Sequence, residues 1–395
     1  MLKLLCISDL HLGEKYSLLD ITHVRDGDCT SYSDALRPFR YEVAALAGLE
    51  PQDEPKVQVH TLVLLGDIFE LATALLPTAA EAGRSFFDWL FGWLEADEVV
   101  YVPGNHDHVF WMWWKTCIQS GQNWWQADPQ GVKEALARAY EAVEIKASAP
   151  GSPEPVASDS HGDLLKMFFG EHLKQTSFSI GYPVYCGPSA VPAGYSSSHC
   201  FNTIFTHGHL NDPRFVRPAD LISKGMHALS RSWDAKTGSL AELEATTWPF
   251  TNKWWYPPKK ETSLGERLYL LGEKLGEMSE MFKFKLPTPC RHLSGADAAA
   301  YPYETPPDLM GPDATSPNDF YSLLQEVGPK WYLQPLLLVY GHTHHGGAMP
   351  LPNPLVLVCN TGGWLTIVAD RPVHTHMFAI NDSGVATMKR VDFQV

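Results

Sequence analysis

Five short clusters of Asp, His and Asn residues each follow an apolar run in the sequence. Along the chain they read SDLHLG, LGDIFE, PGNHDH, THGHLND and YGHTHHGG. Their chemically competent side chains are Asp9, His11, Asp67, Asn105, His106, Asp107, His207, His342 and His344. Imidazole suits first-row transition metals, and carboxylate suits harder divalent ions. A mixed oxygen and nitrogen set without thiolate therefore predicts a catalytic site for two metal ions rather than a structural zinc site.

Asp67 is the residue that we expect to join the two ions, because it stands on a tight Gly-Asp turn. A single carboxylate can bridge two ions that lie about 3.5 to 4 Å apart. Two divalent ions carry more positive charge than Asp9, Asp67 and a bridging hydroxide can neutralise. The remaining positive charge is what would hold a phosphate group.

The apolar runs before the clusters have the length and composition of buried β-strands. The first three are KLLCIS, HTLVLL and EVVYVP. A helical pattern precedes the third at residues 82–96, where Phe86, Trp89, Leu90 and Trp93 recur with the spacing of one helix face. A second series of runs, from CFNTIFTHGH to VHTHMFAI, has few helical patterns between its members. We therefore expect sheet packed against sheet with helices outside, and a ligand beyond the carboxyl ends of the strands.

The ordered set D-x-H, GD, GNHD, HGH and GHTH resembles the calcineurin-like metallophosphoesterase superfamily. The resemblance covers residues 9–344 and implies an α/β fold, a four-layer αββα sandwich of two mainly mixed sheets flanked by helices. It implies a first metal bound by Asp9, His11, Asp67 and His344, and a second bound by Asp67, Asn105, His207 and His342. It also implies that His106 sits by the leaving-group oxygen, where it stabilises charge or donates a proton.

His106 needs a carboxylate partner to hold its tautomer. Asp107, which we group with His106 as catalytic, is adjacent in sequence, and Asp9 is an alternative partner; the sequence leaves this choice open. Four further residues near the motifs are candidates for contacts with the substrate. They are His108, His209, Arg214 and His345.

Two regions interrupt the rhythm of strands, and we interpret residues 108–200 and 210–334 as insertions in a single domain over 1–395. We expect them to form a cap over the active site. Both are rich in tryptophan. These rings either pack the insertions against each other or against a second copy of the chain, giving a homo-oligomer, or wall a pocket for an apolar or aromatic leaving group.

Composition excludes several classes of protein. The net charge of −15 over 395 residues disfavours a long nucleic acid as partner, because such binding depends on Lys and Arg. The seven cysteines include no C-x-x-C pair, which argues against a disulfide framework and a thiolate zinc cluster. No stretch approaches the roughly 20 apolar residues of a membrane-spanning helix. With no cleavage site near the N-terminus, we expect a cytoplasmic protein.

Taken together, these features predict a metallophosphoesterase, a phosphoric ester hydrolase that uses two divalent ions chosen from Mn, Fe, Zn, Ni and Co. The expected substrate is a small phosphodiester or a pyrophosphate-linked molecule, attacked by a hydroxide that bridges the metals. One alternative is a phosphomonoesterase, including a protein phosphatase. The other is a binding protein that holds metal on the same core without catalysis.

Overall fold

A computed structural model describes the core of the chain in fifteen segments. These are residues 1–14, 17–19, 29–50, 55–71, 76–107, 154–155, 168–170, 176–181, 184–196, 200–208, 335–342, 344, 346–350, 356–364 and 374–393. All structural statements below concern these residues.

The larger of two β-sheets has eight strands in the order β4-β5-β3-β2-β1-β12-β13-β7. The strands are β1 (Leu2–Ile7), β2 (Val57–Leu65), β3 (Leu94–Val102), β4 (Glu154–Pro155), β5 (Ser177–Ile180), β7 (Val191–Pro192), β12 (His374–Asn381) and β13 (Val385–Asp392). β1, β2, β3 and β5 run parallel to one another, whereas β12 is antiparallel to β1. The sheet is therefore mixed, and the carboxyl ends of its four parallel strands meet at one edge.

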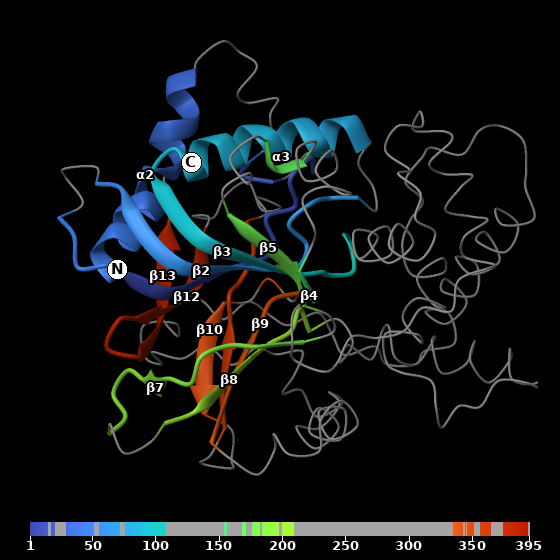
Figure 1. Cartoon of the computed structure of the whole chain (residues 1–395). Helices are drawn as coiled ribbons and strands as arrows, with labels where there is room; N and C mark the ends of the chain where they lie inside the picture. Colours follow the sequence, from blue (N-terminus) through green and yellow to red (C-terminus); the bar gives the residue numbers. More distant parts are fainter. Residues whose placement is uncertain are drawn as a thin grey trace, which may run out of the picture.

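The smaller sheet has five strands in the order β10-β11-β9-β8-β6. The strands are β6 (Tyr185–Cys186), β8 (Asn202–Phe205), β9 (Leu336–Tyr340), β10 (Gly347–Pro350) and β11 (Val356–Asn360). β8, β9 and β11 are parallel, and the two outer strands are antiparallel to their neighbours. Figure 1 shows this sheet facing the larger one, with β8, β9 and β10 on the side away from the labelled helices.

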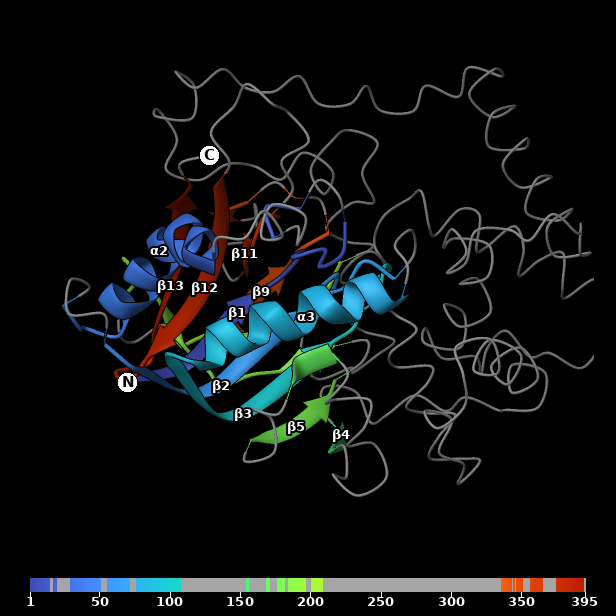
Figure 2. The ribbon, with the colours of Figure 1, turned by 90° about the horizontal axis from the view of Figure 1, so that it is seen from above.

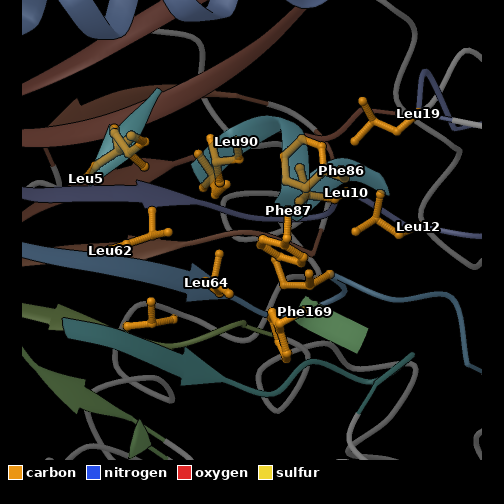
Figure 3. Close-up of a cluster of buried hydrophobic side chains, with 14 of the residues drawn as sticks. Leu5, Leu10, Leu12, Leu19, Leu62, Leu64, Phe86, Phe87, Leu90 and Phe169 are labelled. Carbon is orange, nitrogen blue, oxygen red and sulfur yellow. The ribbon is translucent and has the colours of Figure 1, made fainter. Parts of the chain in front are cut away.

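Two helices, α2 (Cys29–Leu46) and α3 (Leu76–Phe91), cover the outer face of the larger sheet. Seen from above in Figure 2, α2 lies over β12 and β13, and α3 crosses the parallel strands. Apolar side chains fill the space between helices and sheet (Figure 3). They include Leu5, Leu62, Leu64, Phe86, Phe87 and Leu90.

A second apolar layer lies between the two sheets, because side chains alternate along each strand. In β1, Leu5 packs toward the helices while Leu4 and Cys6 face the smaller sheet. Leu337 and Val339 of β9 belong to the same layer. The predicted α/β sandwich with two mixed sheets is thus confirmed; helices on the outer face of the smaller sheet would lie outside the described residues.

The helix predicted at 82–96 ends earlier than its pattern suggested. α3 stops at Phe91, and β3 starts at Leu94, so the last residues of the pattern belong to a turn and a strand. Trp93, which repeated with the helix face, lies in that turn with 4% of its surface exposed. Its burial rather than its helical position explains the apolar spacing.

The range 108–200, which we expected to be an insertion, contributes four short strands to the sheets: β4, β5 and β7 to the larger, and β6 to the smaller. The described part of this range therefore belongs to the core. Most of it, with all of 210–334, lies outside the described residues, so the cap stays a prediction. Among the described residues, no helix combines the length and apolar character needed to cross a membrane.

Candidate metal centre

The five sequence clusters follow the carboxyl ends of β1, β2 and β3 in one sheet and of β8 and β9 in the other. Contacts between these loops bring the two sheet edges together. His207, after β8, places its Nε2 atom 3.2 Å from Oδ2 of Asp67, after β2. His344, after β9, places its Nε2 atom 3.4 Å from Oδ1 of Asp9, after β1. The chain thus assembles residues more than 300 positions apart into one site.

Backbone conformation marks the same residues independently of their side-chain contacts. Among the described residues, five that are not glycine have a positive φ angle. They are Asp9 (51°), His11 (48°), Asp67 (49°), His342 (70°) and His344 (59°). A non-glycine residue in this region costs on the order of 1–3 kcal/mol, and such strain gathers at functional sites. All five are residues that the resemblance assigns as metal ligands.

The first group of potential ligands consists of Asp9, His11 and His344, whose ligand atoms lie within 4.8 Å of one another. Nε2 of His11 lies 3.1 Å from Nε2 of His344. Nδ1 of His11 lies 2.9 Å from Oε2 of Glu70, a carboxylate that can only accept a hydrogen bond from it. The other nitrogen of neutral His11 therefore turns a lone pair toward His344 and Asp9, as metal coordination requires.

The second group consists of Asp67, His207 and His342, again within 4.8 Å. Nδ1 of His207 lies 3.1 Å from the carbonyl oxygen of Leu65 and must donate to it. Nε2 of His207 lies 3.2 Å from both Asp67 Oδ2 and Asn105 Oδ1. In neutral His207 three acceptor atoms would converge on one point, which is stable only with a cation among them.

Asp67 lies between the two groups. Its Oδ2 atom is 3.2 Å from Nε2 of His207 and 3.8 Å from Nε2 of His11, and its Oδ1 atom accepts the backbone N–H of His106 at 2.8 Å. Gly104 permits this approach, since a Cβ atom there would come within 2.2 Å of Asp67 Oδ1. The geometry suits a carboxylate shared by two ions.

In the metal-free site, buried carboxylates raise the pKa values of nearby imidazoles, and these imidazoles lower the pKa values of the carboxylates. Burial alone would raise the pKa of Asp67, but the charges of His207 and His106 hold that pKa well below its ordinary value. Burial would lower the pKa of His207, but Asp67 and Asp9 raise it to about 9. A divalent ion would replace such a proton, so the residues present fit a pair of metal ions.

Glu70 is a site residue that sequence reasoning missed. It is 1% exposed, and its carboxylate contacts Nδ1 of His11 at 2.9 Å and Nδ1 of His106 at 2.7 Å. These imidazoles hold the pKa of Glu70 well below its ordinary value despite burial. The partner of His106, left open between Asp107 and Asp9, is thus Glu70 among the described residues. One feature of the sequence could have indicated Glu70: it directly follows two apolar residues, Ile68 and Phe69, that are typical of a buried segment.

Asp107 has a different set of contacts from those expected of a catalytic carboxylate. It is fully buried and accepts hydrogen bonds from backbone N–H groups and from one hydroxyl. The donors are Gly104 N (2.7 Å), Ile68 N (2.6 Å), Phe69 N (3.3 Å) and the Tyr101 hydroxyl. Burial and the charge of Asp67 raise the pKa of Asp107 to about 6. Asp107 ties the loop after β2 to the loop after β3, and its catalytic role stays a prediction.

The four candidates for substrate contacts, His108, His209, Arg214 and His345, all lie outside the described residues. The assignment of each to the substrate therefore also stays a prediction. The nine motif residues from Asp9 to His344 are all described, and they lie on the loops that the structure brings together.

Comparison with known proteins gave two findings. No family model matches the chain, and no curated protein matches it. Among solved structures, a phosphopantetheinyl hydrolase from Mycobacterium tuberculosis is similar at 12% identity and a TM-score of 0.24, covering 92% of this chain and 90% of that one. A dimetal phosphatase from Danio rerio is similar at 12% identity and a TM-score of 0.34, covering 99% of this chain and 96% of that one.

Proposed function

We propose that this chain is a hydrolase that uses two divalent metal ions to cleave phosphoester bonds, with a small phosphodiester or a pyrophosphate-linked molecule as substrate. One observation carries the proposal. The five described non-glycine residues with positive φ angles are all predicted metal ligands, and they fall into the two side-chain groups described above. Backbone strain at five ligand positions in one site is what pre-organised metal coordination would require.

The metal positions would be held by residues from both sheets. The first would use Asp9, His11, Asp67 and His344, and the second Asp67, Asn105, His207 and His342. When bound, two divalent ions of Mn, Fe, Zn, Ni or Co would act as Lewis acids, activate a water molecule and neutralise charge on a phosphoryl group. The proposed ligands are carboxylates, imidazoles and one amide, so the ions would supply positive charge for a phosphate beside the predicted contact with Arg214.

His106 is positioned to act on the leaving group. Its side chain is 30% exposed, so it can reach a substrate, and its Nδ1 atom is held by Glu70. Burial would lower the pKa of His106, but in the metal-free site Asp67 and Glu70 raise it to about 10. With metal bound, the contact with Glu70 is the one that would keep the imidazole protonated. With Nδ1 bonded to Glu70, the proton on Nε2 is available to the leaving oxygen.

Glu70 fixes two imidazoles with one carboxylate. Its bond to His106 holds the acid in one orientation, and its bond to His11 fixes the tautomer in which Nε2 can bind metal. The chain thereby links the orientation of the proposed acid to that of a ligand in the first group. Because Glu70 orients both of these imidazoles, we assign it to the proposed active site and not to the structural core.

We infer a small substrate from the net charge of the chain. The net charge of −15 opposes a long polyanion, whereas a single phosphodiester or pyrophosphate could be held by two metal ions alone. The predicted cap at 210–334 would restrict the substrate further. Relative turnover of a diester and a monoester distinguishes these two classes of substrate.

The test is a substrate panel with added Mn²⁺ that compares bis(4-nitrophenyl) phosphate with 4-nitrophenyl phosphate. We expect turnover that disappears in EDTA and a higher kcat/KM for the diester. A higher value for the monoester would favour a phosphomonoesterase, and no turnover by metal-loaded protein would favour a non-catalytic scaffold. His60→Ala is a matched control, because His60 forms an exposed pair with Asp97 at 2.9 Å and should leave turnover unchanged.

A further inference from the structure

The segment Asn360–Trp364, with the sequence NTGGW, begins at the last residue of β11 and contributes none of the residues proposed above. It is buried throughout, and Asn360, Thr361 and Trp364 have no exposed surface. Buried polar groups need hydrogen-bond partners. The partners of this segment lie at the ends of β1 and β9, the strands that lead to the first group of ligands.

On the side of β1, the segment is bonded to the backbone and side chain next to the ligand Asp9. The backbone N–H of Trp364 donates to the carbonyl oxygen of Asp9 at 3.1 Å. The carbonyl oxygen of Gly362 lies 3.3 Å from the hydroxyl of Ser8. These contacts join the smaller sheet to the start of the loop that carries Asp9 and His11.

On the side of β9, the segment is bonded to the residues that lead into His342 and His344. The backbone N–H of Thr361 donates to the carbonyl oxygen of Tyr340 at 2.9 Å. The side-chain amide of Asn360 donates to the carbonyl oxygen of Gly341 at 3.2 Å. One segment of five residues therefore holds the starts of both ligand loops.

A chain of hydroxyls reaches the Asp9 carboxylate itself. Ser8 Oγ donates to Asp9 Oδ2, and Thr361 Oγ1 lies 2.5 Å from Ser8 Oγ. Ser8 has one hydroxyl proton, and a carboxylate is a stronger acceptor than the Gly362 carbonyl, so Ser8 donates to Asp9. Thr361 Oγ1 then donates to Ser8, the nearer of its two acceptors, since the carbonyl oxygen of Tyr340 lies at 3.1 Å. Asp9 Oδ1 is then left to face His344 Nε2 at 3.4 Å while it accepts the N–H of His342 at 2.9 Å.

Gly363 packs against the ring of His344, the other ligand of the first group that the segment contacts. A Cβ atom on Gly363 would lie 2.7 Å from Cγ and 2.9 Å from Cδ2 of His344. The ring is thus packed directly on the backbone of the segment. Trp364 anchors that backbone, since its fully buried ring lies 5.2 Å from the rings of Phe39 and Phe393.

We propose that Ser8 and the segment Asn360–Trp364 are the positioning element of the first metal position, formed by Asp9, His11 and His344. This inference rests on the proposed function. The hydroxyl chain orients the Asp9 carboxylate, and Gly363 sets the plane of the His344 ring. Among the described residues, the segment reaches the second group through backbone, where Asn360 donates to the carbonyl oxygen of Gly341 next to His342. Its effect should therefore be larger at the first of the two ions.

The experiment is a Mn²⁺ titration of the full chain by calorimetry after treatment with EDTA. Wild-type protein should bind two equivalents. Ser8→Ala should weaken one of them by roughly 10- to 100-fold and change the other far less, as for other residues that support a metal ligand. Gly363→Ala should weaken the same equivalent at least as much, because its new methyl group displaces the His344 ring.

Two backgrounds identify which position responds. In His207→Ala, which removes a ligand of the second position, Ser8→Ala should still weaken the remaining equivalent. In His344→Ala, which removes a ligand of the first, Ser8→Ala should add little. This pattern distinguishes positioning of the first metal from a general loss of structure, which would weaken binding in both backgrounds.

Two variants serve as controls because they remove buried hydroxyls that do not reach Asp9. Ser17 Oγ donates to the carbonyl oxygen of Leu10 at 2.7 Å, and Thr375 Oγ1 donates to the carbonyl oxygen of Thr361 at 3.3 Å. Ser17→Ala and Thr375→Val should leave both affinities unchanged. Thermal unfolding in EDTA checks the fold of each variant, and Thr361→Val replaces Ser8→Ala as the deciding variant if the latter does not fold.

The outcomes separate the inference from the proposed function. Two equivalents in the wild type with unchanged affinities in Ser8→Ala, or with equal weakening of both, would overturn the inference and leave the proposed function standing. A folded wild-type chain that binds no Mn²⁺ would overturn the proposed function, and the inference with it. Selective loss at the first position supports both.

Discussion

The two sheets make unequal contributions to the candidate metal centre. Loops of the eight-stranded sheet supply every carboxylate described in the site, whereas loops of the five-stranded sheet supply imidazoles. The carboxylates are Asp9, Asp67, Glu70 and Asp107, and the imidazoles from the smaller sheet are His207, His342 and His344. Each of the two ligand groups proposed above combines members of both sets, whereas a third cluster of potential ligands, His11, Glu70 and His106, lies wholly on loops of the larger sheet. Both proposed metal positions therefore need residues from the two sheets, and metal binding there should depend on the alignment of the sheets.

The two sets of loops are also held differently. Those of the larger sheet are cross-tied by buried carboxylates, with Asp107 joining the loops after β2 and β3 and Glu70 joining His11 to His106. The imidazoles of the smaller sheet rest on backbone, as in the contact of His207 with the Leu65 carbonyl. The comparison predicts that substitutions of the carboxylates on the loops of the larger sheet will impair the site most.

The largest effect is expected from Asp67→Asn, because the asparagine lacks the charge that two ions would share and the ions would then repel each other. We expect activity below detection and less than two equivalents of bound metal. Elemental analysis of purified protein, beside a hydrolysis assay, measures both. An active Asp67→Asn variant with two full equivalents would remove Asp67 from the bridging position.

His106→Ala should lower kcat by roughly 10²- to 10⁴-fold and leave metal content intact, because His106 is proposed to act without binding metal. The loss should shrink for substrates whose leaving groups need little protonation. His60→Ala is the matched control. If metal content fell together with activity, His106 would have to be reassigned as a ligand.

Glu70→Gln should lower kcat by roughly 10- to 100-fold and weaken metal binding, because a glutamine can accept from only one of His11 and His106 and presents N–H to the other. The loss of metal affinity should persist in a His106→Ala background, since that part acts through His11. A defect in kcat alone would show that the contact with His11 does not support metal binding.

Metal-free protein should become less stable as the pH rises from about 6.5 to 9, the range between the ordinary pKa of histidine and the raised pKa of His207. In this range the unfolded chain has released the proton that folded His207 keeps, so stability present below the range is lost through it. Thermal unfolding in EDTA should show a fall of several degrees. Metal-loaded protein should show a smaller fall, because the ion has replaced the proton of His207 whereas His106 keeps its own; equal slopes with and without metal would contradict the assignment of His207.

The sequence was sufficient to predict the strands before each cluster and the sandwich they form, because buried strands leave a strong local signal. The sequence could not reveal the residues that position the metal ligands, because these act through contacts between distant parts of the chain. Glu70 looks like an ordinary acid until His106 is seen 36 positions later to lie against it. β5 has four residues, and only its pairing with β3 identifies it as part of the core. The role of NTGGW likewise depends on contacts with Ser8, which is more than 350 positions away.

The central claim is that the chain holds two metal ions between its sheets, and an anomalous difference map from crystals grown with Mn²⁺ tests it most directly. The account predicts two peaks, one among Asp9, His11 and His344 and the other among Asp67, Asn105, His207 and His342, with Asp67 in contact with both. A map with no peak between the two sheets, or with a single peak that Asp67 does not contact, would contradict it.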